Sequence, residues 1–410
     1  MLPLPPCRHL DVAIAGGGAV GLALACVLRN FGPSGLSIGV VDPGFGASGR
    51  MQAWSNRTSL IAFGPWRLLC ALGLGDELTS KAQPVLGMEI SESSPDEEIR
   101  LSRLSFDPGS VQNGPLGYLV AHSDLEPALE KLTIALGIDV FRSSIVGFSR
   151  GPASVRLDMD NSAALRASLI VGADGRKSSV RGFARIKTVD RDYNRSAIVA
   201  TIGLEIPHEG IAVQHFFPAG TFALLPMTGN RFSVVWVERP EEARRLCKGA
   251  RESFVEELTK RAGHRWGHLQ LLDEPKTFPL TLSIARSFFA ERIVLAGDAA
   301  HGVHPLAGQG LNLGLRDVGL LVDAINDSAL RGDDLGSAET GRAYEQSTRP
   351  GAVAMAGATD MIFDLFSFQS NAAKFLRSVG IAGFDKLPQL KSRIMQYAMG
   401  REAAAPRLFK

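Results

Sequence analysis

Apolar residues gather in short runs at three widely separated places in the chain, and glycine follows each run within one or two residues. The runs span residues 11–15, 169–171 and 293–295. Short apolar runs bounded by glycine are typical of buried strands in an α/β protein. We therefore predict three buried strands that belong to one domain, assembled from segments far apart in the sequence.

Between the second and third runs the pattern changes to an imperfect alternation of apolar and polar residues. Such alternation predicts a sheet with one face on a core or cavity, and Gly220 and residues 228–230 supply turns. A charged helix is predicted for residues 241–261. The predicted strands are residues 196–206, 212–217, 221–225 and 231–238.

The first apolar run leads into a GxGxxG turn and a helix predicted for residues 19–31, ended by Gly32 and Pro33. In a dinucleotide site the first glycine permits a tight turn, the second lets the pyrophosphate touch backbone, and the third lets helix and strand pack closely. The N-terminus of the helix attracts phosphates because it carries a partial positive charge. The predicted contacts are Gly16, Gly18, Ala19, Val20 and Gly21.

A second strand, predicted for residues 36–41, ends in Asp42. Its carboxylate would accept hydrogen bonds from an adenosine ribose. The alternative is an ordinary glycine turn in an α/β protein. The strand, the helix and the downstream acid together favour a dinucleotide site.

The other two runs also end in acids. The second is followed by Gly-Ala-Asp-Gly, where Asp174 serves a cofactor or caps the next helix. The third is followed by Gly297 and Asp298, then by a Gly-Gln-Gly turn and a helix predicted for residues 311–325. A carboxylate at a strand end can hold a sugar hydroxyl, and glycines let backbone approach a flat ring closely.

In this order, the three motifs resemble those of flavoprotein monooxygenases of the para-hydroxybenzoate hydroxylase type. Residues 304–317, HPLAGQGLNLGLRD, resemble the ubiquinone-biosynthesis hydroxylase branch, as do residues 216–237. The resemblance extends from Val12 to about Gly400. It implies an α/β protein with a Rossmann-like FAD-binding domain, an inserted β-sheet substrate domain and a C-terminal helical segment.

The resemblance also implies a reaction. One non-covalent FAD would accept hydride from transiently bound NADH or NADPH and then react with O2. In this family a flavin C4a-hydroperoxide transfers an OH group to an electron-rich ring. The leading substrate is a polyprenylated phenol in ubiquinone biosynthesis. A small soluble phenol or other aromatic is the alternative substrate, and a flavin-bearing structural subunit of a biosynthetic complex is the alternative function. The ring position, the nicotinamide preference and the base that activates the phenol stay open.

Site residues follow from the same motifs. Arg57 matches the family's arginine over the flavin, and His122 stands where related enzymes commonly have Asn followed by Arg. His122 would thus take part of the role of a phosphate-facing arginine. The remaining cofactor contacts are Asp174, Gly297, Asp298, Gly310, Leu311 and Asn312. The predicted backbone contacts beside the reacting flavin ring are Pro305, Gly308, Gln309 and Gly310.

The resemblance divides the 410 residues into domains. The FAD-binding domain is discontinuous, and the substrate domain consists of two insertions into it. A C-terminal helical segment would span residues 351–410. The predicted FAD-binding pieces are residues 8–74, 102–185 and 281–350, and the predicted substrate-domain pieces are residues 75–101 and 186–280.

Composition excludes several other classes. The net charge of +2 and the lack of a basic run of five disfavour nucleic-acid binding. The four cysteines have no CxxC spacing, and no histidine pair sits in HExxH, so we expect no metal. No run of 18 apolar residues and no targeting segment is evident, which predicts a cytoplasmic protein.

The charge is uneven, because residues 371–410 carry eight basic and two acidic side chains. Their net charge of +6 leaves −4 for the rest of the chain. With its interleaved apolar residues, this tail is either a helical pair packed on the body or a surface for anionic lipid or a partner subunit. The second interpretation would place the protein peripherally on the inner membrane, near other ubiquinone-biosynthesis proteins. Homo-oligomerisation is also left open.

Overall fold

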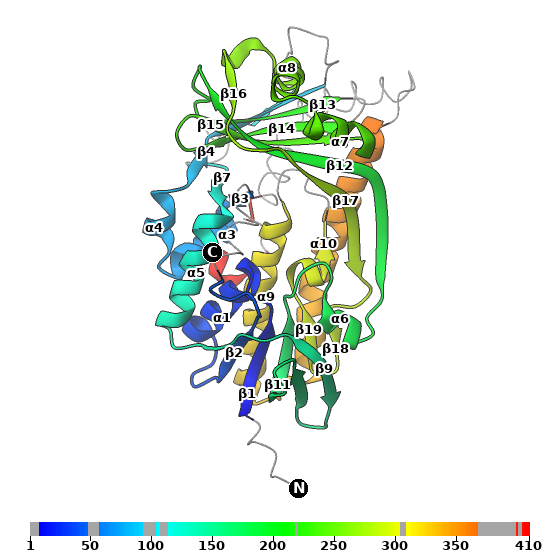
Figure 1. The fold of residues 1–410 in the computed structure, drawn as a ribbon. Helices are drawn as coiled ribbons and strands as arrows, with labels where there is room; N and C mark the ends of the chain where they lie inside the picture. Colours follow the sequence, from blue (N-terminus) through cyan, green and yellow to red (C-terminus); the bar gives the residue numbers. More distant parts are fainter. Residues whose placement is uncertain are drawn as a thin grey trace.

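The computed structural model describes residues 8–47, 57–92, 104–106, 114–217, 220–303, 309–367, 399–400 and 404–410. Two large sheets lie at opposite ends of the molecule, and a small sheet lies between them (Figure 1). Most of the basic tail, residues 371–398 and 401–403, lies outside the described residues. The α/β class predicted from the sequence is confirmed.

An eight-stranded sheet contains all three apolar runs. Strand β1 (Arg8–Ala15) lies at its centre and pairs in parallel with β2 (Ile38–Val41) and β11 (Ala164–Gly172). Strand β11 then pairs in parallel with β19 (Ile293–Leu295). Parallel pairing brings the carboxyl ends of these strands, and the acids that follow them, to one edge of the sheet. The flanking strands are β8 (Asp139–Phe141), β9 (Ile145–Arg150), β10 (Val155–Met159) and β18 (Phe289–Ala290).

Helices cover this sheet and share its core. Helix α1 (Ala19–Phe31) is buried over nine residues and packs against α5 (His122–Ala135) and α9 (Gln309–Arg331). Helix α9 packs in turn on α10 (Ala338–Ser367), which runs from the eight-stranded sheet toward the upper sheet (Figure 1). The nearly all-apolar sequence of α1 fits this burial on several sides.

The small sheet joins the two halves of the molecule. It consists of β3 (Thr58–Ala62), β7 (Gly117–Ala121) and β4 (Gln83–Val85), and helices α3 (Phe63–Ala71) and α4 (Gly75–Thr79) follow β3. Its side chains form a small apolar cluster with residues of the upper sheet.

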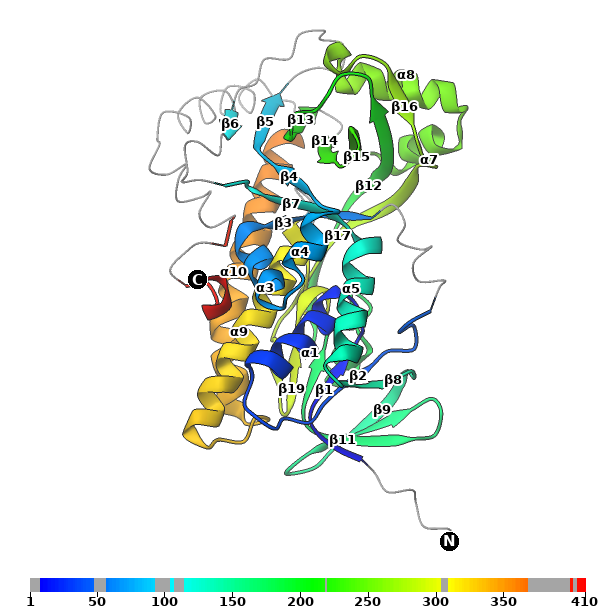
Figure 2. The same cartoon turned by 90° about the vertical axis from the view of Figure 1, so that its left-hand side faces the viewer.

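The upper, nine-stranded sheet is mainly antiparallel, and α7 (Pro240–Lys248) and α8 (Arg251–Ala262) cover its outer side (Figures 1 and 2). Its long strands β12 (Thr188–Leu204) and β17 (Lys276–Ala285) extend down beside α10 and connect the sheets. The other strands are β13 (Ile211–Phe217), β14 (Gly220–Met227), β15 (Arg231–Glu238), β16 (Leu269–Leu271), β5 (Gly87–Glu92), β6 (Leu104–Phe106) and β20 (His301–Gly302).

Several predicted elements differ from the structure in their bounds, among them the helix predicted for residues 311–325, which spans Gln309–Arg331 as α9. The single helix predicted for residues 241–261 is wrong, because Gly249 adopts an extended conformation and separates α7 from α8. The strand predicted from Ser196 begins eight residues earlier, at Thr188, because its first part pairs with β17. The domain division stays a proposal. None of the described helices has both the length and the apolar run needed to cross a bilayer.

Candidate functional site: a cavity at the ends of four parallel strands

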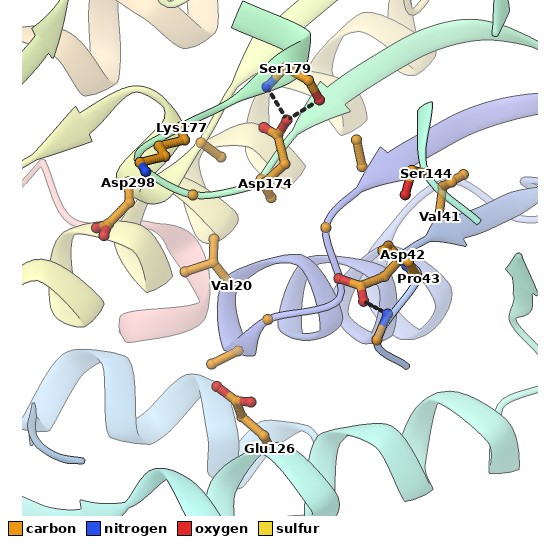
Figure 3. A pocket seen from close by; sticks show the side chains of 18 of the residues that line it. Val20, Val41, Asp42, Pro43, Glu126, Ser144, Asp174, Lys177, Ser179 and Asp298 are labelled. Carbon is orange, nitrogen blue, oxygen red and sulfur yellow. Dashed lines mark hydrogen bonds between the residues drawn. The ribbon is translucent and has the colours of Figure 1, made fainter. Parts of the chain in front are cut away.

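A cavity of about 590 Å³ lies where β1, β2, β11 and β19 end, between α1 and α5. Figure 3 shows acidic side chains approaching it from several elements. Eleven of the predicted contacts line it, drawn from all three motifs. They are Gly16, Gly18, Ala19, Val20, Asp42, Arg57, His122, Asp174, Asp298, Gly310 and Leu311.

The glycine turn at the end of β1 leaves no room for side chains. Gly16 has φ of +108°, and a Cβ there would lie 2.3 Å from the carbonyl oxygen of Ala173. A Cβ at Gly21 would lie 2.0 Å from the carbonyl oxygen of Gly16. No described side chain caps α1 at Gly18, and its first turn has no acidic residue. The first N–H groups of α1 therefore suit an anionic ligand.

Asp42 closes one end of the cavity, directly after β2 (Figure 3). Its Oδ2 accepts a hydrogen bond from the N–H of Gly17 at 2.6 Å, and its Oδ1 accepts one from the N–H of Gly44 at 2.7 Å. A carboxylate oxygen can accept more than one bond, so these contacts orient Asp42 and still allow it to accept from a ribose.

Asp174 lines the cavity and also caps a helix, so both interpretations of this residue have structural support. Its Oδ2 accepts hydrogen bonds from the N–H groups of Ser179 and Val180, at 2.7 and 3.1 Å, at the start of α6 (Ser179–Phe183). Its buried Oδ1 has no hydrogen-bond partner within the described part of the chain. A buried acceptor without a partner is costly, which favours a donor from a ligand.

The second and third motifs meet at Asp298. This residue lies in the short helix η3 (Gly297–Ala299), directly after β19. The Nε of Arg176 donates to its Oδ2 at 3.3 Å, and the Nη2 of Arg176 donates to the carbonyl oxygen of Val303 at 3.2 Å. Arg176 thereby links the Gly-Ala-Asp-Gly turn to the turn that carries Asp298.

A buried pair supports that turn from behind. The Oδ2 of Asp317, on α9, accepts hydrogen bonds from the N–H of Gly297 at 2.8 Å and from the Nε2 of His301 at 2.6 Å. Burial alone lowers the pKa of His301, but the charge and hydrogen bond of Asp317 outweigh it, so the pKa lies above its ordinary value. His301 thus belongs to the frame of the site and does not line the cavity.

On the opposite wall, His122 is held between two partners. Its Nδ1 donates to the Oε1 of Glu126 at 3.2 Å, and its Nε2 lies 2.9 Å from the hydroxyl of Ser59. Burial lowers the pKa of His122, and the hydrogen bond to Glu126 only partly offsets this. His122 is therefore neutral near pH 7.

Several predicted residues lie elsewhere. Gly21 and Gly297 pack behind the cavity, and Asn312 holds the small sheet, because its side chain accepts from the N–H of Ala62 at 2.9 Å and donates to the carbonyl oxygen of Leu60 at 2.8 Å. Gln309 lines a smaller cavity with Asn312. The roles of Pro305 and Gly308 stay predictions, since both lie outside the described residues.

Comparisons with known proteins agree with this geometry. Residues 9–357 match the model of a family described as FAD binding domain. The chain belongs to this FAD-binding family. Over 400 residues it is 35% identical to the ubiquinone hydroxylase UbiL of Rhodospirillum rubrum, covering 97% of this chain and 91% of that protein.

A second relative and a solved structure are also similar to the chain along nearly their whole length. The 3-demethoxyubiquinol 3-hydroxylase of Escherichia coli is 29% identical, with coverage of 95% of this chain and 98% of that protein. The crystal structure of p-nitrophenol 4-monooxygenase PnpA from Pseudomonas putida has a TM-score of 0.77 at 18% identity, covering 97% and 100% of the two chains. The resemblance drawn from the motifs is confirmed, and the chain is an FAD-dependent monooxygenase.

Several residues that line the FAD cavity were not among the predicted contacts. Lys177 lies two residues after the second motif, and Glu126 lies one helical turn after His122, so their spacing could have identified them. Ser143, Ser144 and Ile145 carry no such signal. Pairing of β2 with β8, about 100 residues later in the chain, brings them to the cavity beside Asp42.

Proposed function

We propose that this protein hydroxylates the ring of a polyprenylated phenol in ubiquinone biosynthesis, using NADH or NADPH and O2. The observation that carries the proposal is the 35% identity to a ubiquinone hydroxylase over 97% of the chain. The cavity provides independent support, because its glycine turn, the N–H groups at the start of α1 and the acids at the strand ends suit a dinucleotide. We infer that Gly16, Gly18 and the start of α1 hold the diphosphate, Asp42 the adenosine ribose, and Asp298 the ribityl chain.

Bound FAD would supply hydride acceptance from the nicotinamide and activation of O2. The chain's own residues would then orient and enclose the reactants. Arg57, Gly310 and Asp298 all line the cavity. The small sheet and the upper sheet lie above the eight-stranded sheet (Figure 1). Enclosure by apolar side chains excludes water. This exclusion protects a reactive intermediate from breakdown by water.

Two experiments test the substrate. In a deletion strain, the accumulated lipid should be a prenylated precursor that lacks one ring hydroxyl. Purified protein should then add one oxygen atom from O2 to that precursor while consuming NADH or NADPH, and EDTA dialysis should not abolish the activity. Normal quinone content in the deletion strain, with coupled turnover of a small soluble phenol, would instead support the alternative substrate class.

A buried amide on the upper sheet is our candidate for a substrate contact. Alternate residues of β13 face the same side, and Ala212 packs with Leu60 and Leu119 of the small sheet, while Phe216 stacks on Phe366 of α10 at 3.8 Å between ring centroids. Gln214 lies between them and faces the space between the sheets. It is 6% exposed, and its Nε2 has no hydrogen-bond partner among the described residues.

We propose that the Nε2 of Gln214 donates a hydrogen bond to a ring oxygen of the substrate. Gln214→Leu should then raise the KM for the phenol about tenfold, which corresponds to the upper end of the free energy of one hydrogen bond. It should also uncouple NAD(P)H oxidation from hydroxylation. Its thermal midpoint should stay equal or rise, since an unsatisfied donor is removed. Gln270→Leu on the exposed position of β16 is the matched control. Lower stability with an unchanged KM would show that Gln214 is purely structural.

We also propose that the protein works peripherally at the inner membrane, where a polyprenyl substrate resides. The support is the +6 charge of residues 371–410, whose interleaved apolar residues suit an anionic surface. We further propose that the protein associates with other ubiquinone-biosynthesis proteins and forms homo-oligomers. Sedimentation with anionic liposomes at low salt measures the membrane association. A protein that stays in the supernatant would contradict it.

A further inference from the structure

The exposed face of α10 changes from polar to apolar halfway along the helix. In the first half, its outward positions include Glu339, Gln346 and Ser347. In the second half, which reaches the upper sheet (Figure 2), the exposed residues between positions 351 and 366 are all apolar. Residues three or four apart share one face of a helix, so these form a continuous surface. We call this surface the α10 strip, and it consists of Val353, Ala354, Gly357, Ala358 and Met361.

Nothing in the described part of the chain covers the α10 strip. Val353 and Met361 are 43% and 66% exposed, and a Cβ at Gly357 would meet no atom within 4 Å. The opposite face of the helix, which includes Ala352 and Ala356, is buried against the body. Contiguous apolar surface that is left in water marks an interaction site, because its burial is favourable. The α10 strip is therefore a contact face that needs a partner.

The acids at the edge of the α10 strip are already paired with a cation. Asp360 and Asp364 are the only charged residues among positions 351–367. The Nη1 of Arg191, on β12, lies 3.2 Å from the Oδ2 of Asp360, and its Nη2 lies 2.5 Å from the Oδ1 of Asp364. The hydroxyl of Tyr193 also donates to Asp360. Because both carboxylates face a cation, they oppose an anionic partner only weakly.

The sequence that follows α10 indicates the kind of partner. Residues 371–410 carry a net charge of +6, which suits an anionic surface. A second copy of this chain on the α10 strip would bring two such segments together by symmetry, and their charges would repel each other. An anionic bilayer instead offers acyl chains to the strip and negative headgroups to the basic residues.

We propose that the α10 strip is the face with which the protein contacts an anionic bilayer, with Met361 inserted at the boundary between headgroups and acyl chains. This inference rests on the proposed function, which places a polyprenyl substrate in the bilayer. Phe366, five residues after Met361, stacks on Phe216, which is a neighbour of our candidate ring contact Gln214 on β13. Five residues of helix rise about 7.5 Å, so the strip gives a polyprenyl tail a short path from the bilayer to the space between the sheets.

The test is sedimentation of the holoenzyme with vesicles made of equal parts of phosphatidylcholine and phosphatidylglycerol. Met361→Glu places a charge in the α10 strip and should lower the partition coefficient at least about tenfold, which is the effect of burying one large apolar side chain. Leu330→Glu is the matched control, because Leu330 is 84% exposed near the end of α9. This control should bind vesicles as the wild type does.

Met361→Trp gives a second readout that keeps the α10 strip apolar. After subtraction of the wild-type signal from the four native tryptophans, its emission should shift to shorter wavelength when vesicles are added. Leu330→Trp should show no shift. Equal vesicle binding by Met361→Glu and wild type overturns the proposal, as does an emission of Met361→Trp that vesicles leave unchanged.

Light scattering and turnover distinguish the remaining outcomes. A dimeric wild type that becomes monomeric in Met361→Glu, with unchanged vesicle binding, would show that the α10 strip joins two copies and would overturn the bilayer contact. Met361→Glu should keep its FAD content and its hydroxylation of a short-chain phenol in detergent. A wild type that hydroxylates no phenol, while Met361→Glu selectively loses vesicle binding, would contradict the proposed function and support the bilayer contact.

Discussion

Gly21→Ala is expected to leave the protein largely without FAD, with a Kd more than about a hundredfold higher than that of wild type. The new Cβ would lie 2.0 Å from the carbonyl oxygen of Gly16, in a contact between backbone segments that no side-chain rotation can relieve. Overpacking of this kind costs about 1–3 kcal/mol or more, and relief requires the start of α1 to move. That movement would displace the N–H groups that we assign to the diphosphate.

Gly182→Ala is the matched control. Gly182 lies in α6, and a Cβ there would meet nothing within 4 Å, so alanine should be neutral or stabilise the helix by about 0.5–1 kcal/mol. Flavin absorbance per chain after gel filtration, together with the thermal midpoint, measures both variants. Normal FAD content in Gly21→Ala would show that the approach of α1 to the glycine turn does not govern cofactor binding.

Asp298→Ala is expected to weaken FAD binding about tenfold to a hundredfold. A charge-assisted hydrogen bond to the ribityl chain contributes about 1.5–3 kcal/mol, and the variant loses it. Without FAD, the protein should unfold near the wild-type temperature, because the described partner of the side chain is Arg176 at 3.3 Å, in a partly exposed ion pair.

Asp333→Ala is a suitable control, since Asp333 forms a comparably exposed pair with Arg331 at 2.7 Å, outside the cavity lining. Titration of each apoprotein with FAD gives the affinities. If Asp298 only stabilises its turn, the variant should lose thermal stability. Its FAD affinity should then stay within about threefold of wild type, a change no larger than the contribution of one weak neutral hydrogen bond.

Local sequence patterns were sufficient to predict the frame of the FAD site. The bounds predicted for α1, β15 and β19 are those of the structure, because each element is an uninterrupted apolar or alternating run that ends at a turn residue. The three motifs also predicted which strand ends carry acids. Parallel pairing of β1, β2, β11 and β19 then gathers these acids at one edge.

Features that depend on long-range packing could not be predicted in this way. The break between α7 and α8 is a separate case, because Gly249 after Arg245 and Lys248 is a local helix-end signal that the single predicted helix overlooked. The contact of Ser143 with the FAD cavity follows from the register of β2 and β8, which apolar runs do not reveal. Asn312 belongs to a matching motif, yet its buried amide bonds to the backbone of β3 instead of lining the cavity.

The central claim is that one cavity, built by three motifs, holds a non-covalent FAD that carries out oxygen-dependent hydroxylation. Anaerobic reduction followed by exposure to air tests it most directly. Purified protein should be yellow with about one FAD per chain, released on denaturation, as expected for a single dinucleotide site. NADH or NADPH should bleach it without oxygen, and air should restore the colour while a phenolic precursor gains a hydroxyl group. Colourless protein that cannot be reconstituted with FAD, or product formed without oxygen, would contradict the account.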